Sequence, residues 1–142
     1  MCGIVGFIDR EKNKKKIIKN MANKIAHRGP DAEGFYVDSD IALGHRRLSI
    51  IDLSNGKQPM YNEDESLVVV FNGEIYNYPE LKTELKKHKY KFATKSDTEV
   101  LLHGYEEWGK DLPKKLRGMF AFAIWDKNTK TLFCARDNFG IK

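Results

Sequence analysis

The first residues of the chain bring two reactive groups together. Cys2 directly follows Met1, and a residue as small as cysteine allows the initiator methionine to be removed. Without Met1, Cys2 would carry both a thiol and a free α-amine, and an α-amine with a pKa of about 7.7–8.0 is partly unprotonated at neutral pH. Such an amine can serve as the general base for the nucleophile on its own residue. The alternative is an ordinary terminal strand, buried from its start, that contains a cysteine.

An Asn-Gly pair follows an apolar run later in the chain. Residues 67–71 read as a strand buried on both faces, and the strand is expected to end at Asn72-Gly73-Glu74, before a helix opened by Pro79. A side-chain amide beside an exposed backbone N–H can form an oxyanion hole. The alternative is a simple turn that ends the strand.

Charged residues suggest a second kind of chemistry. Arg46 and Arg47 lie in an expected strand over 41–51 that is apolar on both faces, where an arginine needs an anionic partner. That partner is either a structural carboxylate or the carboxylate of a substrate, which the planar guanidinium fits. Asp97 precedes an expected helix, where it could act as the N-cap or as a partner for a ligand ammonium group. Ser96 and Glu99 are three residues apart, which is the spacing of a capping box.

The remaining pattern predicts the elements that position these residues. Alternation in the strand over 41–51 places one set of residues on one face: Ile41, Leu43, His45, Arg47, Ser49 and Ile51. Cys134 falls within an apolar strand and is expected to be an inert core thiol. The other expected elements are a helix over 17–26, a strand over 34–37, helices over 80–88, 100–108 and 112–116, and a hairpin of 119–125 with 131–135.

Composition limits the class of protein. The 142 residues are 41% hydrophobic and 32% charged, which suits one globular domain, and no apolar run approaches the length of a membrane span. Two distant cysteines and the lack of a signal peptide favour a reducing, cytoplasmic setting. The net charge of +5 comes largely from lysines on helical stretches and favours a solvated face over nucleic-acid binding. No phosphate-binding loop or metal-ligand spacing is present, so no metal, nucleic acid or membrane partner is expected.

Six stretches together resemble one family. They are residues 1–6 (MCGIVG), 27–31 (HRGPD), 47–52 (RLSIID), 72–77 (NGEIYN), 96–100 (SDTEV) and 118–123 (GMFAFA). In this order they are similar to the glutamine-hydrolysing domain of asparagine synthetases. Cys2 with Asn-Gly also resembles the wider class II amidotransferases, which include glucosamine-6-phosphate synthase and the purine amidophosphoribosyltransferase.

The resemblance implies an α+β fold, the four-layer αββα sandwich of N-terminal-nucleophile hydrolases with two antiparallel sheets. It implies one glutamine amidotransferase type 2 domain over residues 1–142. The chain stops at Phe139-Gly140-Ile141-Lys142 without a terminating pattern, so we expect a domain cut at its C-terminal end, with the ATP-binding synthetase domain missing. The implied partners are glutamine and that synthetase domain, and a homodimer is allowed. No cofactor is implied for this chain, whereas Mg-ATP is implied for the missing domain.

The resemblance also implies roles for individual residues. Cys2 attacks the glutamine side-chain amide, Asn72 and Gly73 stabilise the oxyanion, Arg47 binds the α-carboxylate, and the backbone of 48–51 lines the pocket. The implied catalytic residues are Cys2, Asn72 and Gly73, and the implied substrate-binding residues are Arg47, Leu48, Ser49, Ile50, Ile51, Asn72, Gly73, Glu74 and Asp97, the last with Glu74 for the α-ammonium group. Two alternatives stay open: an amidotransferase domain that feeds ammonia to a different acceptor, and a truncated remnant that only binds a partner.

Overall fold

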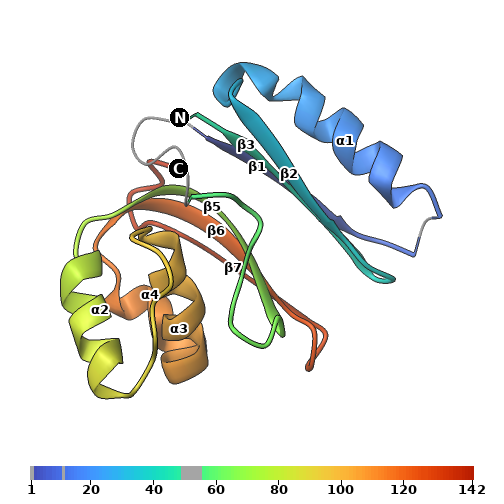
Figure 1. Ribbon diagram of the computed structural model, residues 1–142. Coiled ribbons are helices and arrows are strands. Elements are labelled where there is room, and N and C mark those ends of the chain that lie inside the picture. The colour runs from blue at the N-terminus through green and yellow to red at the C-terminus, as the bar shows by residue number, and fades with distance from the viewer. Residues whose placement is uncertain (1, 11, 49–55) are drawn as a thin grey trace.

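The protein is a sandwich of two antiparallel sheets between two layers of helices (Figure 1). The structure, a computed structural model, describes residues 2–10, 12–48 and 56–142. The strands are β1 (Gly3–Ile8), β2 (Ala32–Val37), β3 (Ile41–Arg47), β4 (Met60–Tyr61), β5 (Leu67–Ile75), β6 (Gly118–Asp126) and β7 (Thr131–Arg136). The helices are α1 (Lys14–Lys24), α2 (Tyr78–Lys87), α3 (Thr98–Trp108) and α4 (Leu112–Lys115), with short 3₁₀ turns at Ala26–Arg28 and Gly109–Asp111.

The first sheet has the order β1-β3-β2, with β3 in the centre. In the register of β1 with β3, Gly3 lies opposite Arg46 and Ile8 lies opposite Ile41. Helix α1 covers the outer face of this sheet through Ile18 and Ala22, both fully buried. β3 is buried on both faces as predicted, but β1 is an end strand whose Ile8 is 62% exposed, so the expectation of a buried N-terminal strand is wrong for that half of it.

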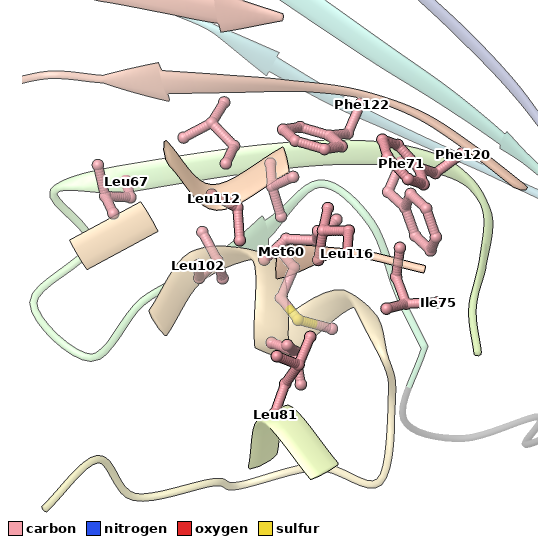
Figure 2. Packing of buried hydrophobic residues seen from close by; sticks show 14 of the residues in the cluster. Met60, Leu67, Phe71, Ile75, Leu81, Leu102, Leu112, Leu116, Phe120 and Phe122 are labelled. Atoms are coloured by element: carbon pink, nitrogen blue, oxygen red, sulfur yellow. The ribbon is translucent and has the colours of Figure 1, made fainter. Parts of the chain in front are cut away.

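The second sheet has the order β4-β5-β6-β7, and its outer face is covered by α2, α3 and α4 (Figure 1). Its largest hydrophobic cluster lies between β5, β6 and these helices; Figure 2 shows Phe71, Phe120 and Phe122 from the sheet meeting Leu102, Leu112 and Leu116. A smaller cluster, which includes Ile41, Leu43, Val68 and Val70, fills the space between the two sheets. Residues of β5 therefore alternate between the two clusters, as expected for a strand buried on both faces.

Most predicted elements are confirmed within a few residues at their ends, but the end of β5 is not. The strand continues through Asn72, Gly73 and Glu74 to Ile75, which lies opposite Gly118 in β6. The Asn-Gly pair is thus part of a paired strand and not its terminating turn. The strand extends this far because its partner β6 begins at Gly118 and supplies backbone groups for pairing up to Ile75.

The predicted capping box is also wrong. Asp97 occupies the N-cap position of α3 but makes no side-chain capping bond, and Ser96 Oγ accepts a hydrogen bond from Thr98 N at 3.2 Å. Glu99 instead accepts hydrogen bonds from the backbone N–H groups of Ala93 and Thr94. Because the Glu99 carboxylate binds the loop before α3, it does not also accept a hydrogen bond from the backbone N–H of the N-cap residue.

Cys134 does not lie in the core. It is exposed on β7, the end strand of its sheet, so the prediction of a core thiol is wrong although the strand itself is confirmed. The neighbours that remain still desolvate the thiol and raise its pKa above the usual value. In the part of the chain that the structure describes, no helix combines the length and apolarity needed to cross a membrane.

Candidate active site

Cys2 directly precedes β1, and β1 contacts β5 of the second sheet. Its Sγ is half-buried and lies 3.9 Å from the carbonyl oxygen of Leu48, just beyond the end of β3. Arg28 Nε donates a hydrogen bond to the carbonyl oxygen of Cys2 at 3.2 Å. The first residue of the predicted site is therefore held on two sides, by the residue that follows β3 and by the 3₁₀ turn Ala26–Arg28.

The two arginines of β3 point in opposite directions. Arg46 Nη1 pairs with Glu33 Oε2 at 3.1 Å, and its Nε donates to the carbonyl oxygen of Ala22 in α1. It therefore has the structural carboxylate that the sequence left open. Arg47 shares the inner face of β3 with His45, toward the second sheet, and only 9% of it is exposed. A methyl group added to Gly56 would come within 2.8 Å of Arg47 Nη2, so the guanidinium lies against the chain at Gly56.

Asn72 faces the space between the sheets. Alternation along β5 places it on the same side as Val68 and Val70, which belong to the cluster between the sheets. Its side chain is 8% exposed, and among the described residues no group forms a hydrogen bond with its amide. A nearly buried amide whose donors no described residue uses is suited to a ligand oxygen.

The backbone N–H of Gly73 points to the open edge of β5. Phe120, which lies opposite Gly73, exchanges its backbone hydrogen bonds with Asp137, because Phe120 N donates to Asp137 Oδ2 and Asp137 N donates to Phe120 O. In an antiparallel ladder this makes Gly73 and Phe120 a non-hydrogen-bonded pair. The polar groups of Gly73 are therefore directed away from β6, toward the edge that β4 covers only at Val68 and Val69.

Glycine is required at position 73. Its φ of +150° lies in a region that other residues rarely adopt, and a Cβ there would overlap the carbonyl oxygen of Met119. Substitution at this position would change both the local backbone and the spacing of β5 from β6.

Two acidic residues, Glu74 and Asp97, lie near the C-terminal end of β5. Asp97 Oδ2 accepts a hydrogen bond from Ile75 N at 3.0 Å, which places the start of α3 against β5. Burial raises the pKa of Asp97, and the negative charge of Glu74 raises it further. A bound cation would relieve the repulsion between these two carboxylates, which is the electrostatic environment that an ammonium group needs.

The predicted site residues that the structure describes thus come from β1, β3, β5 and the loop before α3. Ser49, Ile50 and Ile51 lie outside the described residues. A hollow of about 550 Å³ lined by Ile8, Trp125 and Lys130 among others, and one of about 260 Å³ beside His103, contain none of the predicted site residues.

Sequence reasoning missed two further contacts at the same strand edge. Gln58 Oε1 accepts a hydrogen bond from Phe71 N at 2.6 Å, and His45 Nε2 bonds the carbonyl oxygen of Phe71 at 3.1 Å. Placing His45 on the inner face of β3 was correct, but no local pattern pairs it with a strand 26 residues away. Gln58 lies within the loop-rich residues 52–66, and no motif or periodicity there predicted a role for it.

Comparison with known structures supports the fold. The glutamine phosphoribosylpyrophosphate amidotransferase from B. subtilis, solved with ADP and GMP, superposes with a TM-score of 0.81 at 22% identity and covers 100% of this chain and 38% of its own. An allosteric regulatory enzyme of purine biosynthesis superposes over 75% of this chain with a TM-score of 0.58 and 27% identity. The chain therefore has the fold of the solved amidotransferase from B. subtilis, and the predicted α+β sandwich with two antiparallel sheets is confirmed.

Sequence comparison narrows the family. Asparagine synthetase [glutamine-hydrolyzing] 1 of Bacillus subtilis is 50% identical over 147 residues, which cover 100% of this chain and 23% of the relative. Asparagine synthetase [glutamine-hydrolyzing] 2 of Oryza sativa subsp. japonica is 47% identical and is covered over 24% of its length. The chain thus spans about a quarter of the length of these relatives. The family model for the glutamine amidotransferase domain matches residues 1–142, and the chain belongs to that family.

Proposed function

We propose that this chain is the glutaminase domain of a glutamine-hydrolysing asparagine synthetase. The observation that supports this proposal most directly is a pair of donors on β5, the Asn72 amide and the edge-directed N–H of Gly73, that no described residue uses, in a sandwich whose first strand directly follows Cys2. The names of the curated relatives support glutamine as the substrate.

In the proposed reaction, the Cys2 amine accepts the thiol proton and the sulfur attacks the side-chain amide carbon of glutamine. The carbonyl oxygen becomes an oxyanion, and Asn72 with the Gly73 N–H donates hydrogen bonds to it. The tetrahedral intermediate collapses to a γ-glutamyl thioester, and the amide nitrogen leaves as ammonia with the proton held by the amine. Water then adds to the thioester, and its cleavage releases glutamate and restores the thiol.

Substrate selection follows from the charged groups around this centre. Arg47 is assigned to the α-carboxylate, and Glu74 with Asp97 is assigned to the α-ammonium group, while Leu48, Ser49, Ile50 and Ile51 line the pocket. Together these residues would select an amino-acid zwitterion over a simple primary amide. No cofactor is assigned to this hydrolysis. In a longer protein, a synthetase domain would use the ammonia and Mg-ATP to convert aspartate to asparagine.

The test is release of glutamate and ammonia from L-glutamine by the chain. Cys2→Ala should abolish the release, while the matched Cys134→Ala variant should retain it at the wild-type rate. Hydrolysis that survives in Cys2→Ala would contradict the proposal, as would a folded wild-type chain that releases nothing. Replacing glutamine with a simple primary amide tests the zwitterion requirement.

A further inference from the structure

The backbone N–H and C=O of Phe71, directly before Asn72, are each held by one side chain. Gln58 Oε1 accepts a hydrogen bond from Phe71 N at 2.6 Å, and His45 Nε2 donates to Phe71 O at 3.1 Å. β4 pairs with β5 only at Val68 and Val69. Beyond that point these two side chains satisfy the polar groups that a neighbouring strand would otherwise satisfy.

Gln58 also reaches the opposite side of the site. Its Nε2 lies 3.5 Å from Thr98 Oγ1, the first residue of α3 and the neighbour of Asp97. Its chain continues from Gly56, against which the Arg47 guanidinium packs. One residue therefore contacts the strand with the oxyanion donors and the helix start with the ammonium-binding carboxylate.

His45 connects the two sheets. It comes from β3, the partner of the strand that begins next to Cys2, and it is 1% exposed. Burial lowers the pKa of His45 to about 4, so the ring is neutral near pH 7 and its hydrogen bond to a carbonyl oxygen requires the proton on Nε2. The bond thus ties the sheet of the nucleophile to the strand of the oxyanion donors.

We propose that Gln58 and His45 are positioning residues that hold the backbone N–H and C=O of Phe71 and thereby set Asn72 and Gly73 relative to Cys2. This inference rests on the proposed glutaminase activity and deepens it. Neither residue touches the substrate in this scheme. Their effect arises because displacement of catalytic donors by about 1 Å can lower a rate by about 10²-fold.

The experiment uses two substitutions of similar size, Gln58→Met and His45→Leu, each of which removes one hydrogen bond to the backbone of Phe71. A rescue variant, His45→Gln, and a control variant, Trp125→Phe, are compared with them. His45→Gln keeps a donor near the position of Nε2. Trp125→Phe removes another hydrogen bond between the sheets, from Trp125 Nε1 to Asp38 Oδ2 at 2.8 Å, among residues that carry none of the site. Each variant is measured for glutamine kcat and KM, for the rate of Cys2 alkylation by iodoacetamide, and for stability in urea.

Gln58→Met and His45→Leu should each lower kcat by about 10- to 100-fold, with KM changed by less than about threefold. Alkylation of Cys2 should stay at the wild-type rate, because substitution at iodoacetamide forms no oxyanion. His45→Gln should recover most of kcat, and Trp125→Phe should lose stability but keep kcat.

Two results would overturn the inference: kcat within twofold of wild type in both loss variants, or losses of kcat that Trp125→Phe reproduces at equal stability. If the wild-type chain hydrolyses no glutamine, the proposed function fails separately. Hydrogen exchange then tests the positioning itself. Exchange of the Asn72 backbone amide should accelerate in Gln58→Met relative to that of Ile124, and unchanged exchange counts against the inference.

Discussion

Among single residues, the two cysteines differ in their surroundings. Cys2 is half-buried, with Sγ near the carbonyl oxygen of Leu48, whereas Cys134 is exposed on the end strand β7. Access alone would favour modification of Cys134. Its raised pKa acts in the opposite direction, because it lowers the fraction of reactive thiolate near pH 7.

A glutamine-like chloroketone should therefore label Cys2 before Cys134, since only Cys2 lies where the amino-acid part of the reagent is expected to bind. Peptide mapping by mass spectrometry locates the label, and excess glutamine should protect Cys2 without protecting Cys134. Preferential labelling of Cys134, unaffected by glutamine, would show that the recognition site is elsewhere.

The two adjacent arginines make a matched pair for testing substrate recognition. Loss of one member of a buried charge pair costs about 2–5 kcal/mol. Arg47→Ala should therefore lower kcat/KM for glutamine by roughly 30- to 4,000-fold, with little effect on slow hydrolysis of an amide that lacks the α-carboxylate.

Arg46→Ala is the control, because it removes the pair with Glu33 and the bond to Ala22 on the outer face of the sheet. It should lower stability and leave kcat/KM for glutamine nearly unchanged. Equal losses on both substrates in Arg47→Ala would assign that residue a structural role.

Among the elements, β5 combines an ordinary ladder with a local distortion at Gly73. Gly73→Ala introduces both an unfavourable φ and an overlap with the Met119 carbonyl oxygen. Gly109 has a φ of +54°, and a Cβ there would meet nothing within 4 Å. Gly109 also has a ψ of −128°, outside the left-handed helical region, so Gly109→Ala should cost about 1–3 kcal/mol of unfolding free energy from backbone strain alone, and Gly73→Ala should cost more. Urea denaturation of the two variants measures the difference, and equal costs would show that the β5–β6 pair adjusts without strain.

The loop before α3 depends on a buried ionic cluster. Glu99 accepts bonds from Ala93 and Thr94, and His103 lies between Glu99 and Glu106, with its Nδ1 2.8 Å from Glu106 Oε2 and its Nε2 3.7 Å from Glu99 Oε1. The rings of Tyr90 and Phe92 pack against the imidazole. Burial opposes protonation of His103, but the two carboxylates outweigh it and raise its pKa to about 9.

This raised pKa predicts a pH dependence of stability. An unfolded histidine has a pKa near 6.5, so protonated His103 stabilises the fold fully below about pH 6.5, and this contribution is lost as the pH rises through about 9. The difference in unfolding free energy between wild type and His103→Gln should therefore shrink from pH 6.5 to pH 9.5. Urea titrations at both values test this, and a constant difference would mean that His103 is not charged in the fold.

Across the whole molecule, the sequence predicted which segments form helices and strands better than it predicted how the strands pair and where they end. Apolar patterns located the longer strands and helices, because burial against a core leaves a local pattern, whereas the division into two sheets was implied only by the family resemblance. The end of β5 was missed because it depends on pairing with β6 more than forty residues later, which no local pattern encodes. Cys134 was misplaced for a related reason, since an apolar strand pattern does not reveal that the strand lies at the end of a sheet.

The candidate site was predicted unevenly for the same physical reason. Cys2, Asn72, Gly73 and Asp97 have distinctive local contexts and could be named from the sequence. The choice between Arg46 and Arg47 required the positions of Glu33 and α1, and the contacts of Gln58 and His45 with Phe71 required the fold. Contacts between side chains and distant backbone groups have no periodic signature.

The proposed mechanism also predicts the covalent state of the chain. If the Cys2 amine is the base, active protein should lack Met1, and intact mass spectrometry should show the loss of one methionine. A variant with lysine inserted between Met1 and Cys2 should keep its methionine and lose hydrolysis. Active protein that retains Met1 would exclude the amine as the base.

The pairing of β1 with β3 sets the order of events during synthesis. β1 forms its ladder with residues 41–46 of β3, from Gly3 opposite Arg46 to Ile8 opposite Ile41, so the ladder is not complete until the ribosome has synthesised β3, which ends at Arg47. At ~5–20 residues per second, this interval is roughly 2–9 s. During that time the N-terminus is an unpaired chain end, open to the peptidase that removes Met1. Once β3 emerges, the same residues become an end strand of the sheet, so removal of Met1 from the proposed nucleophile would be favoured before the first sheet forms.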